Sequence, residues 1–254
     1  MRQAVIIAAN TFRETIRDRV LAVIIVFALI MIAGSLWLGS ISLGEQSRMM
    51  TDFGLVVVTG FGLIVAVFVA ASLVRKEVEK RTVFVLFSKP VSRAAFIVGK
   101  FLGMCGTMAV VMAGMGFFLL ALVWLVGGGP SGIVLLATLT IYVQLVVIIA
   151  ITILFSTVSS AILASVLGMC VFVAGQLSHS VLSLTQLGHN ALTEALSWVV
   201  YALIPNFTAI DLKAGAVGEA DVAWGQLALW TAYLAAYVVV VLVASTAIFR
   251  RKEF

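Results

Sequence analysis

The sequence has very few charged residues for its length. Only 11% of its 254 residues are charged, and 63% are hydrophobic, whereas soluble domains carry about 25% charged residues. So few charges cannot cover a water-facing surface of this size, so lipid must be the solvent for most of the chain. Once the long apolar runs are set aside, about a hundred residues remain, in pieces too short for a soluble catalytic domain.

Cysteine is also scarce. Its two copies, Cys105 and Cys170, both lie inside apolar runs, which favours small core residues over a disulfide or a metal pair. The net charge of +5 does not indicate nucleic-acid binding, because the basic residues flank apolar runs as the positive-inside rule describes.

Six long apolar runs are present instead. A helix needs ~20 apolar residues to cross a bilayer, and continuous runs of that length form helices in lipid because a helix satisfies its own backbone. The sequence therefore predicts one all-α, polytopic membrane domain over residues 1–254, with spans at 20–43, 53–74, 101–126, 133–155, 161–184 and 224–249.

The Lys and Arg residues indicate the orientation of these spans. Fourteen of the sixteen fall in the first nineteen residues, in the stretch 75–100 and in the C-terminal tail. With both termini inside, the inner side holds fourteen basic and five acidic residues, and the outer side two basic and six acidic ones. The positive-inside rule then predicts that both termini are cytoplasmic.

Two segments outside the spans are expected to be helical. In residues 2–19, Val5, Ala9, Phe12 and Ile16 recur at helical spacing, which favours an amphipathic helix along the inner membrane surface; the alternative is a plain extension of the first span. Between spans five and six, the apolar stretch 196–204 is too short to cross. It predicts a short helix at the outer interface, ended by Pro205.

The cytoplasmic stretch 75–100 is long and has an internal pattern. It reads Arg-Lys-Glu-Val-Glu-Lys-Arg-Thr from Arg75, and Lys-Pro-Val-Ser-Arg from Lys89. Its middle favours a helix of mixed charge that Pro90 ends. From spacing alone, a docking helix and a solvated connecting loop are equally supported.

This order of residues resembles the first cytoplasmic loop of ABC-2 type permeases, the membrane subunits of one class of ATP-binding-cassette exporters. In particular it is similar to the branch associated with multicopper-enzyme maturation and copper processing. Six spans, the N-terminal amphipathic helix, the stretch Leu203-Ile-Pro-Asn-Phe207 and the basic tail from Arg250 also match. The resemblance therefore extends over essentially the whole chain.

The resemblance implies a function and partners. Residues 77–88 would form a coupling helix that docks on a separate ATPase, with the contact and the following bend made by Glu77, Glu79, Thr82, Leu86, Pro90 and Arg93. The sequence has no Gly-x-x-x-x-Gly-Lys-Ser/Thr phosphate loop, so ATP would be bound by the partner and no cofactor by this chain. The implied unit has two ATPases and two permeases, the second permease being another copy of this chain or a close relative. By the same resemblance it lies among the lipids of a prokaryotic cytoplasmic membrane and can have an extracytoplasmic partner.

Small residues mark two places where helices can approach closely. One set comprises Gly99, Gly103, Gly106 and Thr107; the other comprises Ala161, Ala164, Ser165 and Gly168. Similar permeases use their first and fifth spans at the dimer interface, so the second set is the predicted dimer seam.

Other functions are less well supported. His179 and His189 lack further ligands, and Met104, Met108, Met112 and Met115 recur at helical spacing, which is more typical of packing than of a copper path. A secondary transporter needs ionisable groups at membrane depth, and a membrane enzyme needs a catalytic constellation; the spans carry neither. A non-transporting membrane scaffold remains the main alternative.

Overall fold

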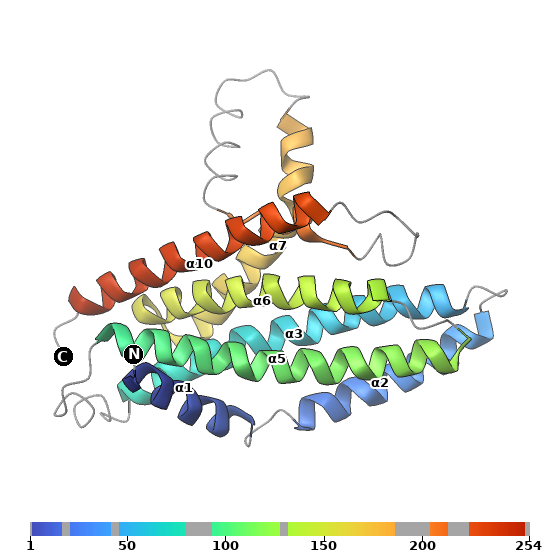
Figure 1. The fold of residues 1–254 in the computed structure, drawn as a ribbon, viewed down its shortest axis with the longest axis horizontal. Coiled ribbons are helices and arrows are strands. Elements are labelled where there is room, and N and C mark those ends of the chain that lie inside the picture. Colours follow the sequence, from blue (N-terminus) through green and yellow to red (C-terminus); the bar gives the residue numbers. More distant parts are fainter. Residues whose placement is uncertain are drawn as a thin grey trace.

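A computed structural model describes residues 2–16, 21–41, 46–79, 93–127, 132–185, 204–212 and 224–251. In these ranges the chain is built of α-helices and one short 3-10 helix, without a strand (Figure 1). In chain order the helices are α1 (Arg2–Thr15), α2 (Leu21–Ile41), α3 (Gln46–Glu79), α5 (Arg93–Leu125), α6 (Gly132–Val158), α7 (Ala161–Thr185), the 3-10 helix η2 (Thr208–Ile210) and α10 (Trp224–Arg251).

The apolar runs of the sequence coincide with these helices. Among the described residues, α2, α3, α5, α6 and α10 are each long and apolar enough to cross a membrane. The fifth run forms α7, a helix of 25 residues whose described apolar part is Ala161–Leu177. The all-helical, multi-spanning fold is therefore confirmed, with five helices of spanning length.

Local chemistry explains the helix ends that can be followed. Gly127, just beyond α5, has a φ of 93°, a backbone conformation that glycine adopts without strain. Between α6 and α7, the Ser160 hydroxyl oxygen accepts the backbone N–H of Leu163 at 3.3 Å, which is an N-cap. The two helices are thus joined by a tight turn at Ser159 and Ser160.

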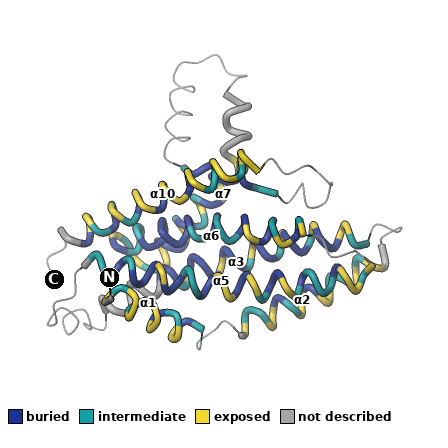
Figure 2. The backbone as a smooth tube through the Cα atoms, viewed as in Figure 1, coloured by how far each residue is buried: buried dark blue, intermediate teal, exposed yellow. Residues whose placement is uncertain are grey.

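The helix α6 lies at the centre of the bundle. It contacts α3, α5, α7 and α10, and 61% of its apolar span is buried, against 11% for that of α2. Figure 2 shows the same contrast, with α6 largely buried and α2 and α10 largely exposed. A shift of α6 would therefore change its contacts with all four of these helices.

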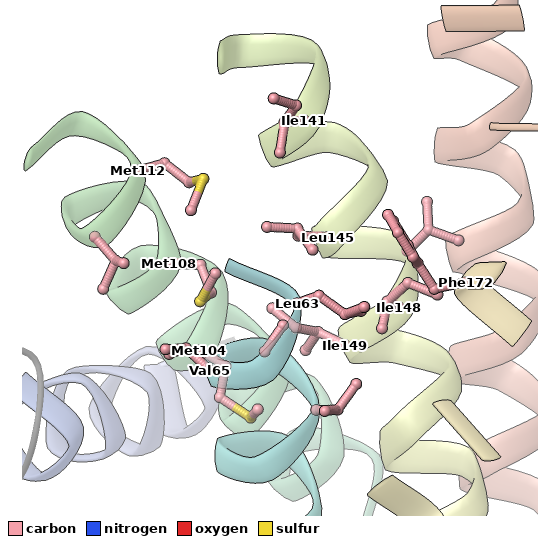
Figure 3. Close-up of a cluster of buried hydrophobic side chains, with 14 of the residues drawn as sticks. Leu63, Val65, Met104, Met108, Met112, Ile141, Leu145, Ile148, Ile149 and Phe172 are labelled. Atoms are coloured by element: carbon pink, nitrogen blue, oxygen red, sulfur yellow. The ribbon is translucent and has the colours of Figure 1, made fainter. Parts of the chain in front are cut away.

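The methionines of α5 fill the space between three helices. Met104, Met108, Met112 and Met115 are all buried, and Figure 3 shows the first three facing side chains of α3 and α6. Unbranched thioether side chains adapt to irregular gaps between helices. Their helical spacing therefore reflects core packing.

Candidate functional site

The helix α3 is much longer than a bilayer requires. Its apolar part is Gln46–Ala71, but the helix continues to Glu79. Eight residues at 1.5 Å each carry it about 12 Å further. Both Glu77 and Glu79 lie on this extension, so the expectation that they open a separate coupling helix is wrong. The reason is local: the residues from Arg75 to Glu79 include no glycine or proline that would end α3 at the membrane.

The remaining predicted coupling residues flank the start of α5. Arg93 is its first residue. Arg93 therefore belongs to α5 and not to the bend that was predicted from Pro90 to Arg93. Thr82, Leu86 and Pro90 lie outside the described residues, and their coupling role stays a prediction. The stretch that contains them connects the ends of two membrane-crossing helices that contact one another, α3 and α5.

The first turns of α5 also hold the end of α10. The rings of Phe96 and Phe249 stack with centroids 5.9 Å apart and planes 16° from parallel. Lys100, only 2% exposed, places its ammonium 5.6 Å from the centroid of Phe96, within the range of a cation–π interaction. The end of α10 is thereby held against the first turns of α5, the helix that follows the predicted coupling residues in the chain.

The N-terminal helix is fixed to the same part of α5 by a glycine stripe, Gly99, Gly103 and Gly106. A Cβ atom on Gly99 would lie 2.8 Å from the Ala4 carbonyl oxygen, and one on Gly103 would lie 2.6 Å from that of Ala8. Residue numbers rise together along the contact, so α1 and α5 run in the same direction. Without side chains on the stripe, the two backbones approach as closely as in Gly-x-x-x-Gly pairs of membrane helices.

Because of this contact, α1 has one face that is buried against the bundle and another that is exposed. Thr11 and Thr15 are buried toward the bundle, whereas Val5 and Ile6 are each 63% exposed. The position of α1 along the inner membrane surface stays a prediction, and the exposed pair would face lipid there. The helix is also an integral part of the bundle, which its sequence pattern did not predict.

A second candidate site is the buried segment 204–212. Pro205, Asn206, Phe207 and Ile210 are buried, although only Thr208–Ile210 is helical. The carbonyl oxygen of Phe207 accepts a hydrogen bond from Gln144 Nε2 at 3.4 Å, and Gln144 is near the middle of α6. Twelve residues precede it in the helix, or about 18 Å. Non-helical backbone at that depth is tolerated only where protein or water satisfies it.

Two helices satisfy the polar groups of this segment. The N–H of Phe207 donates to the carbonyl of Gly175 at 3.3 Å, and the hydroxyl of Thr208 donates to the carbonyl of Gln176 at 2.9 Å. Gln176 Nε2 in turn donates to Gln144 Oε1 at 3.1 Å. Gln144 and Gln176, hereafter the glutamine pair, thus link α6, α7 and the segment into one polar group.

Comparison with known proteins identifies the family. The sequence profile described as ABC-2 family transporter protein matches residues 5–254. The chain belongs to the ABC-2 transporter family. A search of the curated proteins finds no match. Membership and the apolar helices together make it a multi-pass integral membrane protein and a component of a membrane transporter.

In this ABC-2 permease, most of the predicted dimer seam faces inward. Ala164 and Ser165 are buried in the single chain, and a Cβ on Gly168 would lie 2.5 Å from the hydroxyl oxygen of Thr152. Gly168 therefore packs α7 against both α6 and α3, and Ala164 and Ser165 are enclosed within the single chain. A dimer seam at these positions stays a prediction. Small residues serve wherever membrane helices approach closely, inside one chain as well as between chains.

The outward face of α7 is formed by other residues. Ile162, Leu163 and Val166 are at least half exposed, and Ala161 is partly buried. A dimer contact through α7 stays a prediction, and it would involve this branched apolar face.

No metal site emerges from the described part of the permease. In that part, no three His, Cys, Asp or Glu side chains come together. The backbone of His179 belongs to α7, while His189 and the short outer helix predicted at 196–204 lie outside the described residues, apart from Ile204. The methionines of α5 are core residues, which confirms the interpretation of their spacing as core packing.

The sequence did contain a signal for the glutamine pair. Gln144 interrupts the fourth apolar run and Gln176 the fifth. A polar side chain within a span faces the bundle interior and is a candidate for function. Gln144 and Gln176 were not predicted as functional residues, because only ionisable groups were considered within the spans.

Proposed function

We propose that this chain is the permease subunit of an ATP-binding-cassette exporter. It couples ATP hydrolysis on a separate ATPase to the export of a substrate, or to force transmission, across the membrane. The observation that carries the proposal is the ABC-2 family match over residues 5–254. The proposal gives ATP to the partner, because the sequence contains no phosphate loop.

The proposed topology has six spans with both termini inside, in a prokaryotic cytoplasmic membrane. The five helices of spanning length and α7 supply the six segments. The stack of Phe96 on Phe249 and the contact of Gly99 with Ala4 bring the start of α5, the end of α10 and the start of α1 together. Chain ends that meet on one side agree with the segregation of Lys and Arg.

The proposed docking surface lies at this inner end. The α3 extension carries Glu77 about 9 Å and Glu79 about 12 Å beyond its apolar part. Thr82, Leu86, Pro90 and Arg93 follow them in the chain, before or at the start of α5. A stiff extension can transmit a push that a flexible loop would absorb. In the proposed assembly, two ATPases bind two permease chains at these surfaces.

The test is affinity purification of the full-length chain from its native membrane, followed by identification of the proteins that accompany it. We expect an ATPase with a phosphate loop, whose hydrolysis rate changes when the permease is bound. The purified permease alone should not hydrolyse ATP. Recovery of the intact chain without any ATPase would refute the exporter and favour the scaffold.

A matched pair of variants tests the docking surface. Glu77→Ala/Glu79→Ala should retain membrane insertion but lose most ATPase binding, because both residues belong to the proposed docking surface. Glu45 precedes the other end of α3 and Asp52 lies near that end. The variant Glu45→Ala/Asp52→Ala should bind the ATPase like the wild type. Equal binding by the two double variants, at equal expression, would remove the α3 extension from the contact.

A further inference from the structure

The 204–212 segment is attached to the bundle in an unusual way. Its backbone reaches the level of Gln144 in the middle of α6, yet the bond from Gln144 to the Phe207 carbonyl is 3.4 Å and that from Phe207 to the Gly175 carbonyl is 3.3 Å. Both long bonds are at or beyond the upper limit of good N–H···O geometry.

The packing of Phe207 depends on one glycine. Its ring is completely buried, with its centroid 5.6 Å from that of Phe172. The ring lies where a Cβ of Gly175 would be, at 2.5 Å, and the Pro205 carbonyl oxygen lies 2.7 Å from the same point. In lipid, burial of an aromatic ring gains packing but little from the exclusion of water. The segment is therefore seated by shape and by hydrogen bonds that include two long ones at Phe207 and a shorter one, at 2.9 Å, from the Thr208 hydroxyl to the Gln176 carbonyl.

The bonds that hold the segment come from both arms of one helical hairpin. The helices α6 and α7 run antiparallel from the turn at Ser160, in a register that pairs Thr152 with Gly168 and Gln144 with Gln176. A slide of α7 along α6 would separate the glutamine pair, and with it the support for the Phe207 carbonyl.

The inner end of this hairpin is connected to the α3 extension. The hydroxyl of Ser156 donates to the carbonyl of Ala71 at 3.3 Å. Ala71 is the last residue of the apolar part of α3, just before the extension. A displacement of α3 by a bound ATPase therefore acts directly on the hairpin that holds the segment.

We propose that the 204–212 segment withdraws from Gly175 and the glutamine pair during the ATPase cycle, and that Gln144 is the residue that positions it at rest. Withdrawal leaves the amides of Gln144 and Gln176 facing the space that the segment had filled. The result is a polar opening near the middle of the bundle. This inference rests on the proposed function, because the ATPase supplies the displacement.

Hydrogen exchange tests the proposal without knowledge of the substrate. The permease and its copurified ATPase are placed in nanodiscs, and exchange of the peptide 204–212 is followed by mass spectrometry without nucleotide and with ATP plus orthovanadate. We expect exchange to be about five- to tenfold faster in the trapped state, as for the loss of a net hydrogen bond. Amides in the middle of α6 should not change.

Three variants of the permease identify the cause. Gln144→Leu, which removes the donor to Phe207, and Gly175→Ala, whose methyl group displaces the Phe207 ring, should each give fast exchange at 204–212 without nucleotide. Gly60→Ala is the control, because no atom lies within 4 Å of a Cβ at that position; it should exchange like the wild type. Slow exchange in α6 verifies that each variant is folded.

The outcomes separate the two proposals. If an ATPase copurifies and couples but exchange at 204–212 is the same in both nucleotide states, the segment is a fixed part of the bundle and the withdrawal is refuted. Wild-type exchange in a folded Gln144→Leu variant would remove the positioning role of Gln144. If no ATPase copurifies, the proposed function itself fails.

Discussion

At the scale of single residues, Thr152 is the clearest defect of the core. Its hydroxyl oxygen is the one buried side-chain N or O atom of the described residues without a hydrogen-bond partner, and an unsatisfied buried group costs about 1–3 kcal/mol. Thr152→Val keeps the shape and removes the hydroxyl. We predict a gain of about 1 kcal/mol in the free energy of unfolding, measured by denaturant unfolding in detergent micelles.

The control for Thr152 is another buried threonine of α6. The hydroxyl of Thr138 donates to the carbonyl of Val134 at 2.9 Å, so Thr138→Val deletes a satisfied group and should give no gain. If Thr152→Val is no more stable than Thr138→Val, the Thr152 hydroxyl has a function or a partner that compensates its burial.

At the scale of elements, the glycine stripe of α5 decides where α1 lies. A methyl group on Gly103 would meet the Ala8 carbonyl oxygen at 2.6 Å and the Thr11 Cβ at 2.7 Å. Backbone cannot move aside as a flexible side chain can, and overpacking of this kind costs about 1–3 kcal/mol. We predict that Gly103→Ala loosens α1, with faster hydrogen exchange across residues 3–15.

Gly60→Ala on α3 is the comparison for this prediction. Nothing lies within 4 Å of its Cβ position, and alanine is the better helix former by about 0.5–1 kcal/mol. It should leave α1 exchange unchanged. Unchanged exchange in Gly103→Ala as well would mean that other contacts, and not the stripe, hold α1.

The elements themselves were largely predictable from the sequence. Long runs without charge gave the spanning helices, because in lipid nearly every backbone group must bond within its own helix. Two helices have features that composition alone could not predict. The helix α3 continues through charged residues of good helix propensity, and α1 docks on glycines whose role appears only when two distant segments are brought together.

At the scale of the whole molecule, the 204–212 segment shows what a single sequence conceals. The resemblance pointed to the Pro-Asn-Phe stretch, but not to its hydrogen bond with Gln144, 63 residues earlier in the chain. Such a pairing depends on how α6, α7 and the segment are arranged in space, so hydrophobic periodicity carries no information about it. The inward direction of Ala164 and Ser165 was hidden for the same reason.

The orientation of the whole molecule yields the last prediction. With Cys105 and Cys170 replaced by alanine, a single cysteine at Arg48 should react with a membrane-impermeant thiol reagent on intact cells, because the proposed topology places the start of α3 outside. A single cysteine at Lys252 should react only after the membrane is permeabilised, since moving the basic tail outside opposes the positive-inside rule. A cysteine at Arg13 on α1, which is exposed, should behave like that at Lys252. Labelling of Lys252 from outside, with Arg13 protected, would give an odd number of crossings and overturn the six-span topology.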